Sequence, residues 1–313
     1  MKIVFMGTPQ AAVPTLKRLI DDGHELVSVW TQPDRPAGRG RKMAASPVKE
    51  FALDNNLTVH QPEKIKTKES IGLFRSQDAD AAIVVAYGRI LSKSYLNAFP
   101  NGCINVHFSL LPKYRGAAPV NWAIVNGEVK TGITTMKMDI GLDTGDILLQ
   151  RETAIGSEEN AIELMDRLSW IGADLLSETL LNLDQINPVP QDHTLATLAP
   201  IMTKEDGLID WERSAVEISN RIRGFQPFPR SFSSYLGQKV TIWSAHTAEE
   251  IMQDSITAEI GTIVEAGGDD LIVQCGGGTR LKINELQIEG KRRMKTRDFL
   301  NGVTLTKGER LGV

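Results

Sequence analysis

The chain has 313 residues, of which 41% are hydrophobic and 24% charged, with a formal net charge of −4. These values are typical of a soluble globular protein of about two domains, and the acidic balance gives no support by itself to a nucleic-acid partner. Cys103 and Cys275 lie far apart without metal-ligand spacing, and no apolar run is long enough for a signal peptide or membrane span; the sequence therefore predicts a cytoplasmic protein without a disulfide framework, structural metal or membrane anchor.

The first residues predict a βαβ unit. Lys2–Met6 is apolar enough for a buried strand, Gln10–Asp22 has the spacing of an amphipathic helix, and Glu25–Thr31 is a second strand. This order favours a doubly wound, mostly parallel sheet of the Rossmann-like α/β class. The turn after the first strand has only Gly7 and lacks G-x-G-x-x-G, so a dinucleotide role is not expected.

Further buried strands are expected at Ala81–Ala86, Gly102–His107 and Thr131–Met138, and the pattern of Asn160–Leu181 predicts a long amphipathic helix. We assign residues 1–189 to this first domain. The proline-containing residues 190–208 are expected to form a linker.

The remaining residues, 209–313, show a different pattern of predicted elements. After one predicted helix come short strand-like runs separated by glycine turns, a pattern typical of a small OB-like β-barrel. The predicted elements are the helix Ser214–Arg223 and the strands Lys239–Ser244, Glu259–Glu265, Asp270–Gln274 and Thr279–Leu286.

The strongest chemical signal comes from three polar residues. Asn105 and His107 alternate along a predicted strand and so share a face, and Asp143 lies in a glycine-rich loop after a later strand. Asn and His can stabilise the oxyanion that develops when an amine attacks a formyl carbonyl, and a carboxylate can take the amine's proton. A single histidine or aspartate is more often structural, but together the three favour catalysis.

These residues resemble a known family. The N-x-H motif, the following S-L-L-P and the later G-L-D-T-G-D are similar to the folate-dependent formyltransferases. The resemblance implies that Asn105, His107 and Asp143 are catalytic and that 10-formyltetrahydrofolate is the formyl donor. It also implies a folate site at Ser109, Leu110, Leu111, Pro112, Val85, Tyr87, Gly88, Ile90 and Asp139. Phe108 departs from the family pattern, in which a small residue is expected.

Two basic clusters bear on the second substrate. The first lies in the Gly- and Pro-rich loop at 31–49, which resembles the loop of those family members that formylate methionyl-tRNA; the second lies in the C-terminal domain, which helps to hold tRNA in such members. Basic side chains suit phosphates, although a short basic run alone is commonly just a solvated surface. The residues expected to bind tRNA are Arg35, Arg39, Arg41, Lys42, Lys291, Arg292 and Arg293, with Arg39 at the position of the family's critical arginine.

The sequence therefore predicts transfer of a formyl group to the α-amine of initiator methionyl-tRNA by a monomer. A formyltransferase acting on a sugar nucleotide, glycinamide ribonucleotide or another small amine is the main alternative. A 10-formyltetrahydrofolate hydrolase and a non-catalytic tRNA-binding protein remain further alternatives; the intact Asn105, His107 and Asp143 speak against the latter.

Overall fold

The structure is a computed structural model that describes residues 1–37, 42–248, 258–303 and 305–312. The chain divides into two compact units. The N-terminal unit consists of Met1–Pro119, Lys130–Ala154 and Leu164–Pro200, and the C-terminal unit of Val120–Val129, Ile155–Glu163 and Ile201–Val313.

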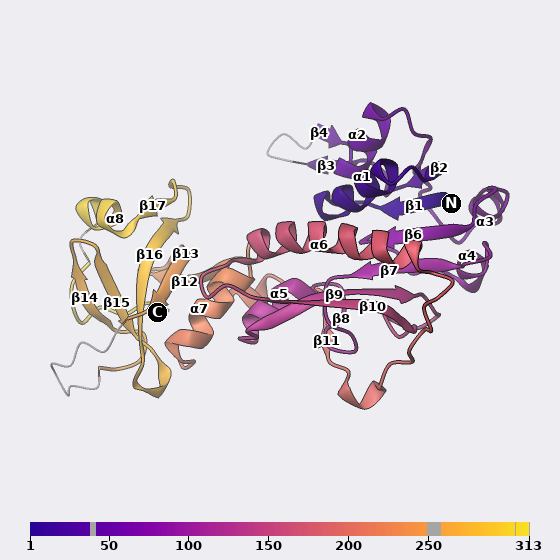
Figure 1. Cartoon of the computed structure of the whole chain (residues 1–313). Helices are drawn as coiled ribbons and strands as arrows, with labels where there is room; N and C mark the ends of the chain where they lie inside the picture. Colours follow the sequence, from indigo (N-terminus) through magenta and orange to yellow (C-terminus); the bar gives the residue numbers. More distant parts are fainter. Residues whose placement is uncertain (38–41, 249–257, 304, 313) are drawn as a thin grey trace. The chain divides into compact units, whose positions relative to one another are not determined.

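The N-terminal unit is built around a seven-stranded sheet in the order β10-β9-β7-β6-β1-β2-β5 (Figure 1). Strands β7, β6, β1, β2 and β5 pair in parallel, whereas β9 is antiparallel to β7 and β10 to β9. This mostly parallel sheet confirms the predicted α/β class. The strands are β1 (Lys2–Gly7), β2 (Glu25–Trp30), β5 (Val59–His60), β6 (Ala81–Val85), β7 (Cys103–His107), β9 (Lys130–Lys137) and β10 (Ile147–Ala154).

Helix α6 (Ala161–Leu181) packs on the sheet near β7 and β9. Gly172 allows a close approach to Val106, and the hydroxyl oxygens of Thr135 and Thr179 are 2.8 Å apart. No helix within the described ranges is long and apolar enough to cross a membrane. The other helices before residue 200 are η1 (Gln10–Ala12), α1 (Val13–Asp21), α2 (Pro47–Asp54), α3 (Lys68–Arg75), α4 (Lys93–Leu96) and η2 (His193–Leu195), together with α5 (Pro119–Val125), which belongs almost entirely to the C-terminal unit.

The direction of chain winding reverses between β1 and β6, because β1 continues to β2 on one side and β6 to β7 on the other. The loops after these two strands are joined: Thr8 Oγ1 donates a hydrogen bond to the Tyr87 carbonyl at 3.2 Å. Crevices at such reversals are the usual binding places in open α/β sheets. The fold therefore directs attention to the carboxyl ends of β1, β6 and β7.

A second, two-stranded sheet ties the expected linker to the N-terminal unit. β8 (Arg115–Gly116) pairs in parallel with β11 (Leu198–Ala199). Gly116 has a φ of +123°, and a Cβ there would lie 2.6 Å from the Ala199 carbonyl oxygen, so only glycine fits this close contact. Part of the segment expected to be a linker is thus packed beside the loop after β7.

The C-terminal unit contains an antiparallel sheet in the order β12-β13-β16-β15-β14, with β17 paired to β16. The predicted β domain is confirmed, but in the described residues its strands do not close into a barrel. The edges are covered by isolated bridges instead, Leu208 with Phe232 and Thr262 with Arg310. The elements are η3 (Glu205–Gly207), α7 (Ala215–Gly224), β12 (Ser231–Tyr235), β13 (Gln238–Thr247), β14 (Ile263–Gly267), β15 (Asp270–Gln274), η4 (Gly276–Gly278), β16 (Arg280–Ile288), β17 (Met294–Lys295) and α8 (Thr296–Gly302).

Candidate active site

Two polar side chains lie on one face of β7. Asn105 and His107 are two positions apart, and alternate strand residues point to the same side. Asn105 is 8% exposed and His107 is 5% exposed. Asn105 is in register with Val84 of β6 and His107 with Thr134 of β9, so both lie between two central strands. Burial of two polar groups at this position is unusual without a partner or a function.

The backbone fixes one nitrogen of His107. Nε2 lies 3.0 Å from the carbonyl oxygen of Tyr114, and because a carbonyl can only accept, this contact requires a hydrogen on Nε2. Nδ1 faces Oδ2 of Asp143 at 3.8 Å, which suits an ion pair but is too long for a hydrogen bond. Nδ1 is therefore the nitrogen through which His107 can exchange a proton with a bound molecule.

Asp143 reaches His107 by a loop that folds back over the sheet. The loop begins beside the first residue of β7, because the Met138 amide donates to the Cys103 carbonyl at 2.8 Å. Oδ2 of Asp143 then accepts a hydrogen bond from the Gly116 amide at 2.8 Å. The structure thus brings the three residues of the predicted trio together, from one strand and one long loop.

Three non-glycine residues in the loops after β6, β7 and β9 have left-handed backbones. Their φ angles are +46° at Ala86, +60° at Tyr114 and +52° at Asp143. Each such residue costs about 1–2 kcal/mol of backbone strain, which persists only where the surrounding structure imposes it. Such residues gather at functional sites, and here they flank Asn105 and His107.

The S-L-L-P segment is held by its own turn and by two polar residues of neighbouring strands. Thr134 Oγ1 donates to the Ser109 carbonyl at 2.7 Å and accepts from the Leu111 amide at 3.1 Å, while Gln150 Nε2 donates to the Leu111 carbonyl at 2.8 Å. The Ser109 hydroxyl donates to the Lys113 carbonyl at 2.6 Å. Thr134 and Gln150 were missed in the sequence, and only their positions in the antiparallel strands reveal their role.

The second predicted folate wall begins at the end of β6 and alternates between buried and exposed residues. Val85 and Tyr87 are buried in the core, whereas Gly88 is exposed and Ile90 is 74% exposed. Burial raises the pKa of Tyr87 to about 12, so its hydroxyl stays neutral at physiological pH. Gln32 Nε2 supports the wall by donating to the carbonyls of Tyr87 and Gly88 at 3.0 and 3.1 Å.

Asp139 organises the loop that carries Asp143. Its Oδ1 accepts hydrogen bonds from the Gly141 amide at 3.0 Å and from the Thr144 hydroxyl at 2.6 Å. The neighbouring Leu142 is 58% exposed, so the loop presents apolar surface as well. The described hydrogen bonds of Asp139 therefore stabilise its own loop.

The basic loop after β2 contains a hairpin rather than only irregular backbone. β3 (Arg35–Ala37) pairs antiparallel with β4 (Lys42–Ala44), and Arg35 and Lys42 are exposed on it. Arg39 and Arg41 lie outside the described residues. The base of the hairpin is fixed: hydrogen bonds from Gln61 and Lys49 lower the pKa of the Asp34 carboxyl. Arg35 Nη2 also donates to Gln32 Oε1 at 2.8 Å, which links the hairpin to the wall after β6.

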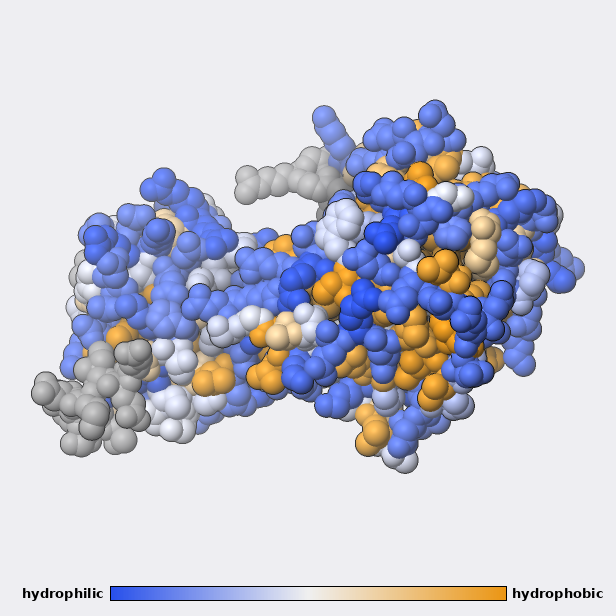
Figure 2. Space-filling view, in the orientation of Figure 1, coloured by the Kyte–Doolittle hydropathy of each residue, from blue (hydrophilic) through white to orange (hydrophobic). Residues whose placement is uncertain are grey.

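The second basic cluster belongs to the C-terminal unit. Lys291, Arg292 and Arg293 are all exposed. Arg293 forms an ion pair with Glu285, and its guanidinium lies 4.7 Å from the ring centre of Trp243. Figure 2 shows a mostly hydrophilic surface on the visible face of this unit. Part of the cluster's charge is thus neutralised within the protein.

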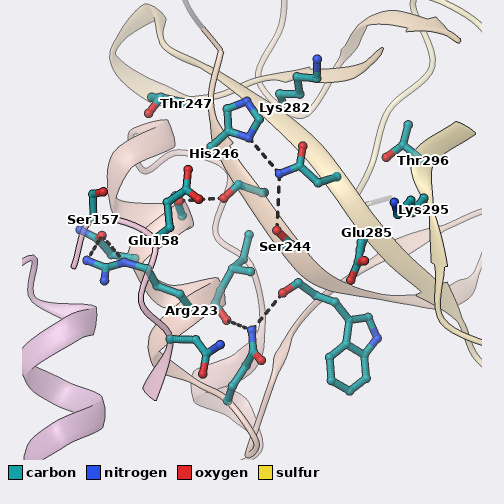
Figure 3. Close-up of a pocket in the computed structure, with 18 of the residues that line it drawn as sticks. Ser157, Glu158, Arg223, Ser244, His246, Thr247, Lys282, Glu285, Lys295 and Thr296 are labelled. Carbon is teal, nitrogen blue, oxygen red and sulfur yellow. Dashed lines mark hydrogen bonds between the residues drawn. The ribbon is translucent and has the colours of Figure 1, made fainter. Parts of the chain in front are cut away.

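A polar cavity of about 820 Å³ opens in the C-terminal unit beside this cluster (Figure 3). Its lining includes His246, Lys282 and Lys295 from the sheet and Glu158 from the segment before α6. The His246 ring is held by Asn284, whose Nδ2 lies 2.9 Å from His246 Nδ1. Because acidic and basic side chains both line it, the cavity is not a purely phosphate-binding surface.

In the described residues, the cysteines and the acidic side chains form no second catalytic or metal centre. Burial raises the pKa of Cys103 and of Cys275 to about 12, so neither is a reactive thiolate at neutral pH. In the part of the chain that the structure describes, no three His, Cys, Asp or Glu side chains gather as a possible metal site.

Both the N-terminal and the C-terminal parts of the chain match models of known protein families. A family model described as formyl transferase matches residues 1–180, and one described as formyl transferase, C-terminal domain, matches residues 201–304. A protein of Alkaliphilus oremlandii named methionyl-tRNA formyltransferase is 49% identical over 314 residues, covering 100% of each chain.

Solved structures show the same fold at lower identity. The methionyl-tRNA formyltransferase from Clostridium thermocellum is 20% identical with a TM-score of 0.56, covering 81% of this chain and 95% of that one. An N-formyltransferase from Helicobacter canadensis, solved with folinic acid and dTDP-3-aminofucose, is 19% identical with a TM-score of 0.66, covering 90% and 98%.

Proposed function

The chain belongs to the formyl transferase family, and from that premise we propose that it transfers a formyl group from 10-formyltetrahydrofolate to the α-amine of initiator methionyl-tRNA, for translation initiation. The full-length match to relatives named methionyl-tRNA formyltransferase supports the acceptor. The observation that carries the chemistry is the meeting of Asn105, His107 and Asp143 on one face of the sheet.

The trio can perform the expected transfer in an ordinary acyl-transfer sequence. The amine nitrogen attacks the formyl carbon, a C–N bond forms, and the carbonyl oxygen gains negative charge. The Asn105 amide and a proton on Nδ1 of His107 stabilise that charge. Asp143 takes the proton of the attacking amine, directly or through water, and a proton is returned to the leaving nitrogen as its bond to carbon breaks.

The residues of the N-terminal unit fit a folate. The donor supplies the activated formyl group, and its flat ring requires apolar walls with peptide groups near its edge. Ile90, Ile140 and Leu142 expose 74%, 69% and 58% of their surface in the two loops beside the trio. Exposed large apolar side chains next to buried polar groups favour a ligand that is part aromatic and part polar.

The basic surfaces support a tRNA acceptor. We assign the basic residues Arg35, Arg39, Arg41 and Lys42 of the loop sequence after β2 to the acceptor end, and the C-terminal cluster with its polar cavity to another part of the tRNA. Contacts of this kind position a nucleic acid by its phosphates. We further infer that the protein acts in the cytoplasm as a monomer and that its site requires no metal ligand.

A transfer assay tests the proposal. Purified protein is given 10-formyltetrahydrofolate with charged initiator tRNA, with an amino-sugar nucleotide or with glycinamide ribonucleotide. We expect formylation of the charged tRNA at a rate at least about a hundredfold above the others, since remote binding energy places the amine. Transfer only to the sugar nucleotide would replace the proposed acceptor while keeping the reaction.

A substitution in the S-L-L-P segment tests the donor site. Leu111→Asp is expected to weaken folate binding by about tenfold or more, because an unpaired charge in an apolar slot costs at least about 1.4 kcal/mol. Leu111 is 3% exposed, so folding must be verified by circular dichroism and thermal unfolding. Leu73→Asp, which places the same charge at an exposed position of α3, is the control for the substitution itself. Unchanged folate affinity in a folded Leu111→Asp protein would remove the segment from the site.

A further inference from the structure

The side-chain amide of Gln191 uses its whole hydrogen-bonding capacity around the Asp143 loop. Its Nε2 donates to the carbonyl oxygens of Asp143 and Gly145 at 2.9 and 2.7 Å. Its Oε1 accepts from Nε and Nη2 of Arg115 at 3.0 and 2.6 Å. An amide has two donor hydrogens and two acceptor positions, so no capacity remains.

The partners also fix the orientation of this amide. The guanidinium of Arg115 only donates and the two carbonyls only accept. Exchanging the amide oxygen and nitrogen of Gln191 would therefore place donors against donors at Arg115 and acceptors against acceptors at the two carbonyls. Gln191 and Arg115 are each only 6% exposed, which makes such mismatches costly. The residue therefore holds the loop in one arrangement.

The loop has little freedom elsewhere. Asp143 has a left-handed φ of +52°, a sparsely populated conformation for a residue other than glycine. A Cβ on Gly145 would lie 1.8 Å from the Lys137 carbonyl oxygen, so this end of the loop is tightly packed. Gln191 donates hydrogen bonds to the carbonyl oxygens of both residues, Asp143 and Gly145, from which it is 48 and 46 positions away in the sequence.

We propose that Gln191 is a positioning residue for Asp143, and that Arg115 orients Gln191 for this task. The inference rests on the proposed function, because it acts through the carboxylate that takes the amine's proton. By holding the Asp143 backbone, Gln191 keeps Oδ2 2.8 Å from the Gly116 amide and 3.8 Å from His107 Nδ1. Gln191 itself contacts no reacting atom.

A buried glutamine with similar contacts occurs in the C-terminal unit and serves as a control. Gln274 is 5% exposed, and its Nε2 donates to the carbonyls of Cys275 and Thr279 at 3.2 and 3.1 Å. Its Oε1 accepts from Nε of Arg280 at 3.4 Å. Replacing Gln191 removes four of the described side-chain hydrogen bonds and replacing Gln274 removes three, but only Gln191 adjoins Asp143.

The test compares Gln191→Met, Gln274→Met and the wild type in single-turnover and steady-state formylation of charged tRNA. We expect Gln191→Met to lower the rate constant by about tenfold to a hundredfold while KM for both substrates changes by less than about threefold, because misplacement affects the transition state. Gln274→Met should keep the wild-type rate constant per folded molecule. Gln191→Glu retains an oxygen for Arg115 but loses both donors to the loop, and should show the same defect if Gln191→Met does not fold.

A double variant distinguishes a positioning role of Gln191 from a general loss of native structure. In an Asp143→Asn background, adding Gln191→Met should change the residual rate by less than about threefold, since residues that act as a unit are not additive. A loss as large as in the wild-type background, or a wild-type rate for Gln191→Met and Gln191→Glu, would overturn the proposal. An inactive wild-type protein would instead count against the proposed reaction.

Discussion

Replacing His107 by alanine is expected to lower the turnover of formyl transfer by two to three orders of magnitude, about the cost of losing one oxyanion-stabilising group. Nδ1 of His107 is the nitrogen left for a bound molecule, because Nε2 donates to the Tyr114 carbonyl. Asn105→Ala and Asp143→Ala should produce losses in the same range. The affinity for tRNA should change little, since interactions made in the transition state appear in turnover.

Steady-state and single-turnover kinetics, with tRNA binding measured separately, provide the check. His24→Ala is a suitable control, because its ring contacts the N-terminal amine rather than the site. Wild-type turnover in a folded His107→Ala protein would show that the histidine is only a buried structural residue. A loss confined to tRNA affinity would move the trio from the chemistry to substrate binding.

The second large effect is expected at Arg39. Arg39→Ala should slow single-turnover formylation by about a hundredfold, because a small misplacement of the amine is enough for such a loss. Arg39 lies outside the described residues, but β3 and β4 on either side of it carry the exposed Arg35 and Lys42. Arg39→Lys keeps the charge but not the planar fork, so a large defect in both variants indicates specific geometry.

The control for charge alone is Arg75→Ala, which removes an exposed arginine from α3. It should leave the rate within about twofold, as surface charges commonly contribute little. If both Arg39 variants kept the wild-type rate, the hairpin would be a solvated surface, and an amino-sugar nucleotide would again compete as the acceptor.

Much of the N-terminal fold follows from local sequence. β1 and β2 match the predicted strands to within one residue, and helix α6 begins one residue after its predicted start at Asn160. In the C-terminal unit, β15 (Asp270–Gln274) has the predicted bounds, because glycines stand on both sides of an apolar run. These elements carry their periodicity and their end signals in the same short window.

The missed elements lack that local signal. β12 (Ser231–Tyr235) buries Ser231 and Ser233, so its inward face is not apolar, and Ser233 Oγ accepts from Trp211 Nε1 at 3.0 Å instead. The strand predicted at Glu259–Glu265 begins only at Ile263, after Gly261 with a φ of +80°. In both segments, contacts with residues distant in the sequence determine where the strand lies, and neighbouring residues alone do not predict such contacts.

The candidate site likewise has one part that the sequence predicts and another part that it does not. The alternation of Asn105 and His107 on one strand can be predicted, since it depends only on the period of a strand. The roles of Arg115 and Gln191 cannot, because their bonds join residues 76 positions apart. Nor does the hydrophobic pattern show that β9 runs antiparallel to β7, which decides how the loop with Asp143 approaches.

The division of the chain into interleaved segments has a consequence for recombination. The C-terminal unit takes in residues 120–129 and 155–163. Within it, Asn121 Nδ2 donates to the Gly224 carbonyl at 2.7 Å, and Arg223 Nη1 donates to the Glu159 carbonyl at 2.9 Å. A chimaera made by a single crossover near residue 200 would inherit the two sides of these contacts from different parents. A functional exchange between relatives must therefore transplant three separate stretches of chain together.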